Sequence, residues 1–157
     1  MKIASPLRKG LEDVAVQGGF DRRKSLQDIE QHDWGEPSKD DTSLVTRCLR
    51  LRRKPLCEFT VGDLRIMIGQ RISLPILIPL AVERLEEEPL AEGSFYPGDL
   101  LNAVFGAGEE FWASHPDSFQ RVRKVVGWIK NLLPSLDEIT RSTVLEVLTE
   151  APRSLTE

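Results

Sequence analysis

The sequence is poor in the residues that build disulfide frameworks, metal centres and catalytic sites. It contains two cysteines and two histidines, and aromatic residues make up 6% of the chain. Cys48 and Cys57 match no disulfide framework and no metal-ligand spacing, so we expect two reduced thiols. His32 and His115 do not have the H-x-x-x-H spacing of two metal-binding histidines, and neither lies near a cysteine at ligand spacing. We expect both to be solvated or capping side chains. We therefore predict no cofactor, no metal site and no catalytic residue.

Long hydrophobic runs are also absent. The longest run, 74–82, is interrupted by Pro75 and Pro79. It is much shorter than the roughly 20 residues that span a bilayer. The first residues, MKIASPLRKG, have no apolar segment of the kind found in secretion signals. We expect a cytoplasmic protein that does not contact a membrane.

The net charge of −4 is distributed unevenly along the chain. Residues 1–60 carry 12 basic and 10 acidic residues, whereas residues 61–115 carry 3 basic and 9 acidic residues. The acidic excess is therefore concentrated in the middle of the chain. Because phosphate repels such a surface, this charge pattern argues against nucleic-acid binding by the middle segment.

Apolar residues recur at helical spacing through most of the chain, and no segment has the period of two that is typical of a strand. We predict an all-α fold, a compact irregular bundle of about seven short helices in a single domain. The helical domain is expected over residues 24–150. Residues 1–23 are expected to form a flexible or loosely docked arm, and residues 151–157 a frayed tail.

Capping boxes indicate where three of the helices begin. A serine or threonine followed three residues later by an acidic residue is found at Ser25–Asp28, Thr60–Asp63 and Ser135–Glu138. The helix after the third box is expected to bury one apolar face, made of Leu136, Ile139, Val144, Val147 and Leu148.

Three consecutive glutamates, Glu86 to Glu88, lie at the C-terminal end of a predicted helix. Acidic side chains are unfavourable there, because the helix carbonyls already make that end negative. Residues that are locally unfavourable in this way often mark functional positions. The next loop contains the only tyrosine of the chain, and carboxylates around aromatic rings are typical of a surface that binds a basic partner. The alternative is an acidic surface that only aids solubility. The predicted partner-binding residues are Glu86, Glu87, Glu88, Glu92, Phe95, Tyr96, Asp99, Glu109 and Glu110.

A basic run in the predicted helix 44–54 supports a different function. Arg47, Arg50 and Lys54 share one helix face, so a DNA-binding regulator is the alternative to a protein-binding role. No aromatic residues lie between these cations for base stacking. A solvated face, or binding of the arginines to the acidic loop 33–41 within the fold, also remains open. A small hydrolase that uses Asp or Glu is a third possibility, although neighbouring helical carboxylates point about 100° apart.

Several long strings between about residues 25 and 112 resemble the immunity proteins of contact-dependent growth inhibition (CDI) systems. These strings are DWGEP at 33–37, RRKPLCEFT at 52–60, DLRIMIGQ at 63–70 and PLAEGSFYPGDLL at 89–101. The resemblance implies an all-helical, non-enzymatic protein in the cytosol. Its partner would be the C-terminal toxin domain of a large cell-surface effector, and such toxins are often nucleases. We expect Glu87, Glu92, Tyr96 and Asp99 to face outward and the acidic surface to cover the toxin's basic cleft.

Overall fold

The computed structural model describes residues 19–156, and no β-strand occurs among them. Nine α-helices and two short 3-10 helices follow one another in this part of the chain. The α-helices are α2 (Leu26–Glu30), α3 (Ser43–Leu51), α4 (Val61–Gly69), α5 (Leu74–Glu87), α6 (Asp99–Phe105), α7 (Glu109–Ser114), α8 (Pro116–Leu132), α9 (Glu138–Thr149) and α10 (Arg153–Thr156). The 3-10 helices are η1 (Leu56–Glu58) and η2 (Leu133–Ser135). The prediction of a single all-helical body is confirmed.

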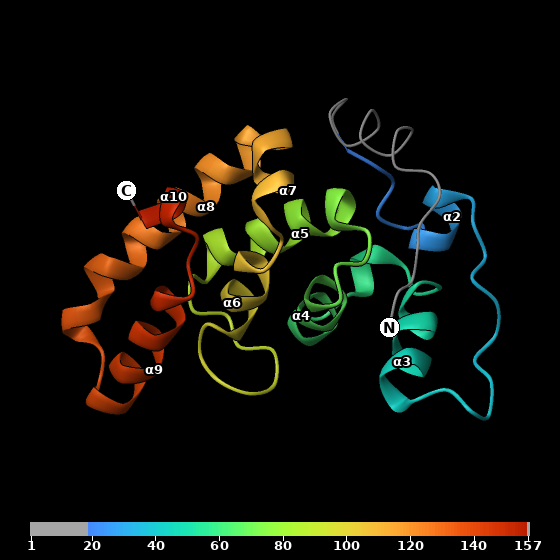
Figure 1. The fold of residues 1–157 in the computed structure, drawn as a ribbon, viewed down its shortest axis with the longest axis horizontal. Coiled ribbons are helices and arrows are strands. Elements are labelled where there is room, and N and C mark those ends of the chain that lie inside the picture. The colour runs from blue at the N-terminus through green and yellow to red at the C-terminus, as the bar shows by residue number, and fades with distance from the viewer. Residues whose placement is uncertain (1–18, 157) are drawn as a thin grey trace.

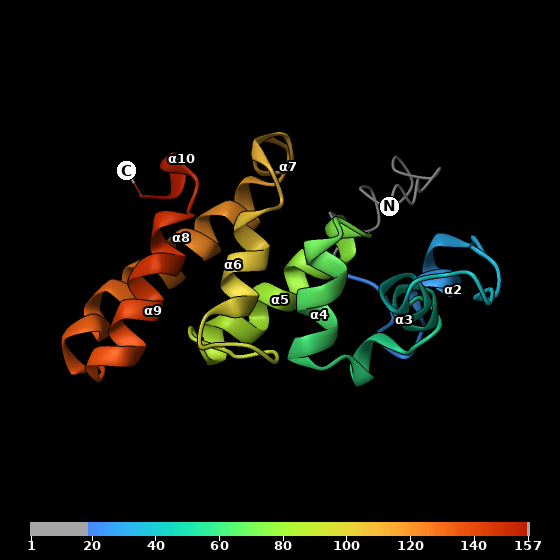
Figure 2. The same ribbon diagram turned by 60° about the horizontal axis from the view of Figure 1, so that its bottom comes forward.

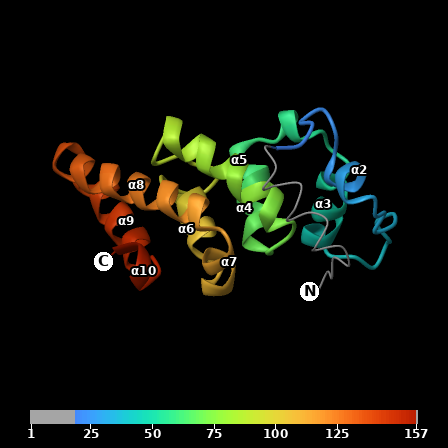
Figure 3. The same cartoon turned by 90° about the horizontal axis from the view of Figure 1, so that it is seen from above.

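The helices are arranged from one end of the molecule to the other in nearly the order of the sequence. Helices α2 and α3 lie at one end, α4 to α6 lie in the middle, and α8 to α10 lie at the other end (Figures 1 and 2). The view from above in Figure 3 shows the same order. In the middle, α4 packs on both α5 and α6, and α5 packs on α8. Aliphatic side chains of α4 and α5 form the centre of the core, among them Leu64, Met67, Ile68, Ile76, Leu77, Val82 and Leu85.

Two of the three predicted capping boxes are confirmed. At Ser25 and Thr60 the cap side chain accepts a hydrogen bond from the third helical residue, whose aspartate accepts one from the cap backbone. The third box is wrong, because Ser135 lies inside η2. Asp137 caps α9 instead, and it accepts a hydrogen bond from the backbone N of Thr140 at 2.9 Å.

Helix α5 carries the predicted glutamates to the surface of the molecule. It has 14 residues, with one proline in its first turn and a second, Pro79, inside the helix. A proline inside a helix removes one backbone hydrogen bond. The helix nevertheless continues for eight residues after Pro79, to Glu87.

The C-terminal part of the chain differs from expectation at Ile139 and in its last residues. Ile139, expected inward, is 81% exposed, because it lies five residues and hence about 140° around the helix from the buried Val144. Residues 153–156, expected in a frayed tail, form α10, in which Leu155 is 2% exposed. The expected arm 1–23 lies outside the described residues up to residue 18. From its described part, Phe20 packs against the core.

Candidate partner-binding surface

The loop between α5 and α6 is closed around one buried carboxylate. Asp99, the first residue of α6, accepts hydrogen bonds from the backbone N of Gly93 at 2.6 Å, Ser94 at 3.0 Å and Phe95 at 3.1 Å. Asp99 is 2% exposed. The expectation that it faces outward is therefore wrong. A carboxylate bound by three N–H groups of its own loop holds the loop in shape and does not present charge to a partner.

Arg65 of α4 joins this carboxylate to the aromatic ring at the tip of the loop. Its Nε lies 3.6 Å from Oδ2 of Asp99, and its Cζ lies 4.4 Å from the centroid of the Phe95 ring. Helix α4 approaches the loop closely at Gly62, where a Cβ would lie 3.3 Å from the carbonyl oxygen of Gly93. Arg65 was not among the predicted site residues. The sequence signal that could have identified it is a single cation inside the apolar run LRIMIG.

The two aromatic side chains of the loop have different surroundings. Phe95 is 69% exposed, although an arginine covers part of its ring. Tyr96 is half-buried and packs against the core, and its hydroxyl oxygen accepts a hydrogen bond from Nδ2 of Asn102 at 2.9 Å. Tyr96 is therefore largely a structural residue, contrary to the expectation that it faces outward. Phe95 is the aromatic side chain that the loop presents to solvent.

The glutamates at the end of α5 do not share one environment. Glu86 accepts two hydrogen bonds from the guanidinium of Arg121 on α8, and this contact raises the pKa of Arg121 above its ordinary value. Glu87, Glu88 and Glu92 are exposed. These three carboxylates are the ones near the loop that face solvent as predicted.

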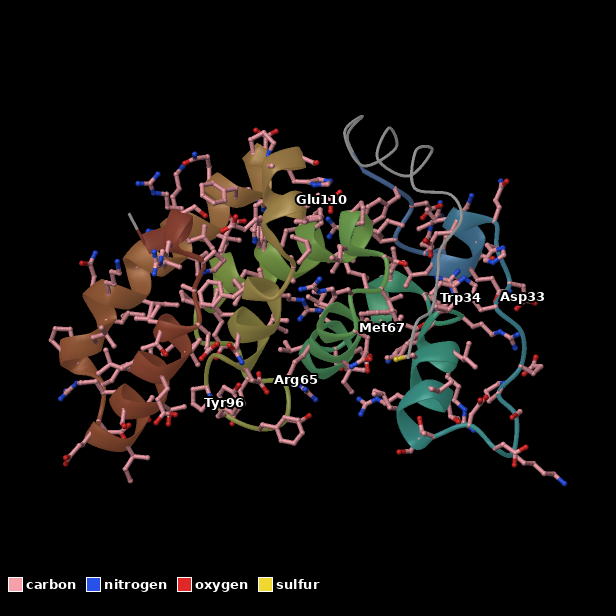
Figure 4. The ribbon with its side chains drawn as sticks, in the orientation of Figure 1. Asp33, Trp34, Arg65, Met67, Tyr96 and Glu110 are labelled. Atoms are coloured by element: carbon pink, nitrogen blue, oxygen red, sulfur yellow. The ribbon has the colours of Figure 1, made fainter. Side chains whose placement is uncertain are left out.

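The remaining predicted carboxylates, Glu109 and Glu110, are exposed in the first turn of α7. Anions in this position complement the positive end of the helix, which is sufficient to explain them structurally. Figure 4 shows Glu110 on one side of α6 and Tyr96 on the opposite side. The nine predicted residues therefore do not form one continuous surface, since α6 separates those on α7 from those on the loop.

The basic run after α3 binds the loop between α2 and α3. Arg52 is 1% exposed and donates hydrogen bonds to the Glu30 side chain and, at 3.0 Å, to the backbone carbonyl of His32. Its Cζ lies 3.8 Å from the centroid of the Trp34 ring. Ser73 donates a further hydrogen bond to Glu30 at 2.8 Å. This network connects α2, the loop and the start of α5 inside the molecule.

Other cations of the same run also have acidic partners. Arg53 pairs with Asp33 at 3.2 Å. Arg47 and Lys54 both approach Asp63, at 3.5 Å and 2.7 Å. Binding to the acidic loop 33–41, one of the alternatives left open by the sequence, is therefore observed for Arg52 and Arg53, whereas Arg47 and Lys54 pair with Asp63 on α4 instead. Two of the three cations on the predicted DNA-binding face, Arg47 and Lys54, therefore lie beside an anion, whereas Arg50 is exposed. This partial neutralisation weakens the DNA-binding alternative.

The side chains suited to chemistry are dispersed. Among residues 19–156, no three His, Cys, Asp or Glu side chains are grouped so that they could hold a metal ion. Cys48 is buried, which raises the pKa of its thiol, whereas the exposed Cys57 lines a pocket of about 190 Å³. This pocket is smaller than the roughly 300–1,000 Å³ that is common for small-molecule sites. His115 stacks on Phe111, with the ring centroids 4.0 Å apart.

None of the helices within the described part of the chain is both long and apolar enough to cross a membrane. The fold and the surface together define an all-helical protein with one loop that is held internally and presents an exposed ring. Residues 28–122, more than half of the chain, match the family model of CDI immunity proteins, and the chain belongs to this family. Proteins of this family are generally non-catalytic, and membership implies that the chain neutralises a cognate CDI toxin. Neither a curated protein nor a solved structure matches the chain.

The family match extends from α2 into the first half of α8. It includes both arginine-bound loops, the one after α2 and the one after α5. The rest of α8, together with α9 and α10, lies outside the matched residues. The resemblance drawn from the sequence strings is confirmed, and the match extends about ten residues beyond the resembling segment, which ends near residue 112.

Proposed function

We propose that this protein acts in the cytoplasm by binding the C-terminal nuclease domain of its cognate CDI effector and covering the basic active-site cleft. Membership of the CDI immunity family is the observation that carries the proposal. The surface we assign to the contact contains the exposed carboxylates Glu87, Glu88 and Glu92. We leave Asp99 out of this surface, because it is buried.

Electrostatic attraction is the physical reason for this choice. A nuclease that binds phosphate has a positively charged cleft, and an acidic surface of a partner accelerates encounter with it. The segment 61–115 has an acidic excess, and Glu87, Glu88 and Glu92 have no ion pair within the described residues. Their charge therefore remains available to a partner, unlike that of Glu86.

The test is a triple charge reversal, Glu87→Lys, Glu88→Lys and Glu92→Lys. We expect association with the toxin domain to slow by about tenfold or more at low salt, with a smaller loss at high salt, because salt screens the attraction. Protection of cells that produce the toxin should fall in parallel. The matched control reverses Glu58, Glu146 and Glu150, which are also exposed, so that net charge changes equally.

Association kinetics measured for both variants decide the question. If the triple variant associates and protects as well as the control, the acidic surface is not the contact. If the wild-type chain does not bind the toxin domain encoded beside it, the neutralising function itself is refuted. A gel shift with DNA at physiological salt should show no binding, and a clear shift would favour the regulator alternative.

A further inference from the structure

Phe95 has an unusual position among the exposed apolar side chains. Within the part of the chain that the structure describes, the large hydrophobic residues that are clearly exposed are Leu44, Phe95, Trp128, Leu132, Ile139 and Leu145. All of them except Phe95 lie on helices. Phe95 lies in a loop, and a loop side chain with no partner is normally free to turn away from water. Here the loop prevents this movement.

Three hydrogen bonds and one close backbone contact hold the loop at Phe95 and at the two residues before it. Asp99 accepts hydrogen bonds from the backbone N of Gly93, Ser94 and Phe95, so three successive residues share one acceptor. Gly93 also lies against Gly62 of α4, where a Cβ added to Gly93 would be 3.2 Å from the Gly62 Cα. The loop is thus fixed to α6 at one point and to α4 at another.

Arg65 fixes the ring itself. Its guanidinium lies 4.4 Å from the ring centroid, within the distance at which a cation is attracted to an aromatic face. The Arg65 side chain is only 18% exposed and also lies near Asp99, so it has little freedom to move away. One face of the phenyl ring is therefore occupied by Arg65, and the rest of the ring remains in solvent.

We propose that Phe95 is the aromatic anchor of the toxin complex and that Arg65 is the positioning residue that holds it ready to bind. This inference rests on the proposed function and names its central contact. Aromatic side chains dominate binding energy when they fill an apolar pocket. An anchor that is already ordered loses little conformational freedom on binding, which favours tight complexes.

The same geometry defines the complementary site on the partner. The toxin domain presents an apolar pocket that receives the exposed part of the Phe95 ring. Basic side chains lie beside this pocket, because Glu92 is exposed three residues before Phe95 in the same loop. The occupant we assign is thus a protein surface that combines an apolar pocket with a basic rim. This is the chemistry expected next to a phosphate-binding cleft.

The first test replaces the ring. Phe95→Ala should weaken binding of the toxin domain by about 30-fold or more, mainly through faster dissociation. Ile139→Ala is the matched control, because Ile139 is 81% exposed on α9 and far from the loop in sequence. It should bind as the wild type does. If Phe95→Ala also binds as the wild type does, the anchor is refuted, although the charge-reversal test of the proposed function can still succeed.

The second test separates positioning from simple structural support. Arg65→Lys keeps the positive charge but removes the planar group that covers the ring. We expect faster hydrogen exchange at the amides of Ser94 and Phe95 in the free protein, and about fivefold weaker toxin binding. In a Phe95→Ala background the same substitution should cause no further loss of affinity, because no ring remains to be positioned. Additive losses in the double variant would overturn the positioning role.

A different occupant would give a different result. If Phe95 covers a second copy of this chain, the free protein will dimerise and Phe95→Ala will make it monomeric. Sedimentation of the wild type and the variant without toxin measures this directly. We expect both to sediment identically, and a loss of dimer in the variant would overturn the assignment to the toxin.

Discussion

In two loops of this protein an arginine lies against an aromatic ring, but one ring is packed against the core and the other is exposed to solvent. In the loop between α2 and α3, Arg52 lies 3.8 Å from the centroid of Trp34, and the arginine is 1% exposed. In the loop between α5 and α6, Arg65 lies 4.4 Å from the centroid of Phe95, which is 69% exposed. The first ring packs against the core and the second faces solvent.

The hydrogen bonds of the two arginines account for the difference. Arg52 donates from Nη1 to Glu30 and from Nη2 to the His32 carbonyl, so both ends of its guanidinium belong to an internal network. Arg65 has a carboxylate nearby, but Asp99 is already occupied by three backbone N–H groups of the loop. The first loop is therefore part of the structural core, whereas the second is a shaped surface. Similar motifs in one chain can thus bury an aromatic ring in one place and leave it exposed in another.

The largest expected loss of stability comes from removing Arg52, the arginine that binds the loop between α2 and α3. Arg52→Ala leaves the buried Glu30 carboxylate without its guanidinium, and removing one member of a buried ion pair commonly costs about 3–5 kcal/mol. We expect that loss in the free energy of unfolding measured with urea. Arg65→Ala is the comparison, and it should lose about 1 kcal/mol, because its side chain is partly exposed. Equal losses would show that the two loops are equally structural.

A smaller loss of stability is expected from replacing Asp99, which accepts the hydrogen bonds that close the loop between α5 and α6. Asp99→Ala removes the partner of three backbone N–H groups, and we expect a loss of about 2 kcal/mol. Hydrogen exchange should accelerate at Gly93, Ser94 and Phe95. Asp33→Ala in the first loop is the control, since Asp33 is exposed and should cost less than about 0.5 kcal/mol. A stable Asp99→Ala variant with unchanged exchange would contradict the assignment of Asp99 as the residue that shapes the loop.

The pH dependence of stability tests the ion pair that connects α4 to the basic run after α3. In this pair, Asp63 on α4 contacts Lys54. Burial acts to raise the pKa of Asp63, but hydrogen bonds from Lys54 and from the backbone of Thr60 outweigh it, and the pKa lies below its ordinary value of 3.8. The ionised group therefore stabilises the fold above about pH 3.8, and this contribution is lost as the pH falls through the lowered pKa.

The matching variant is Asp63→Asn. At neutral pH it should lose about 1 kcal/mol in the free energy of unfolding, because the negative charge that pairs with Lys54 is removed while an acceptor oxygen remains. The difference from the wild type should shrink as the pH is lowered from 5 to about 2, followed by circular dichroism in urea. A constant difference across this range would mean that the charge of Asp63 does not contribute.

The smallest effect is expected at the pair between α5 and α8. Glu86 and Arg121 are both partly exposed, and ion pairs of this kind contribute roughly 0–1 kcal/mol. Glu86→Gln should therefore change the free energy of unfolding by less than about 0.5 kcal/mol and leave toxin binding intact. A large loss of binding without a loss of stability would place Glu86 on the contact surface and show that its pairing with Arg121 does not keep it from the toxin.

Much of the fold was predictable from local sequence, and the exceptions have physical reasons. The boxes at Ser25 and Thr60 were found because a cap and its partner lie three residues apart and need no distant contact. The box at Ser135 failed because η2 extends the end of α8 and moves the start of α9 to Asp137. Ile139 was misplaced because an apolar residue in a first turn does not reveal which face is buried.

The candidate site was predictable only in part. The sequence identified Glu87, Glu88, Glu92 and Phe95, all of which the structure places at the surface. It did not reveal that Asp99 lies inside its own loop, because charge alone does not distinguish a surface carboxylate from one bound by backbone N–H groups. Arg65 was missed because it contacts Phe95 across 30 residues of sequence. Only packing of α4 against α6 brings the two together.

The sequence by itself determined that the chain is helical, where α2 and α4 begin, and that negative charge is concentrated in its middle third. These properties arise from short-range interactions, such as caps, helix-breaking prolines and apolar spacing, which act between residues within about one or two turns. The tertiary structure alone decided which carboxylates face water, which ring remains exposed and which arginine holds it. Those outcomes depend on contacts between helices that are distant in sequence, and burial is set only when the helices pack.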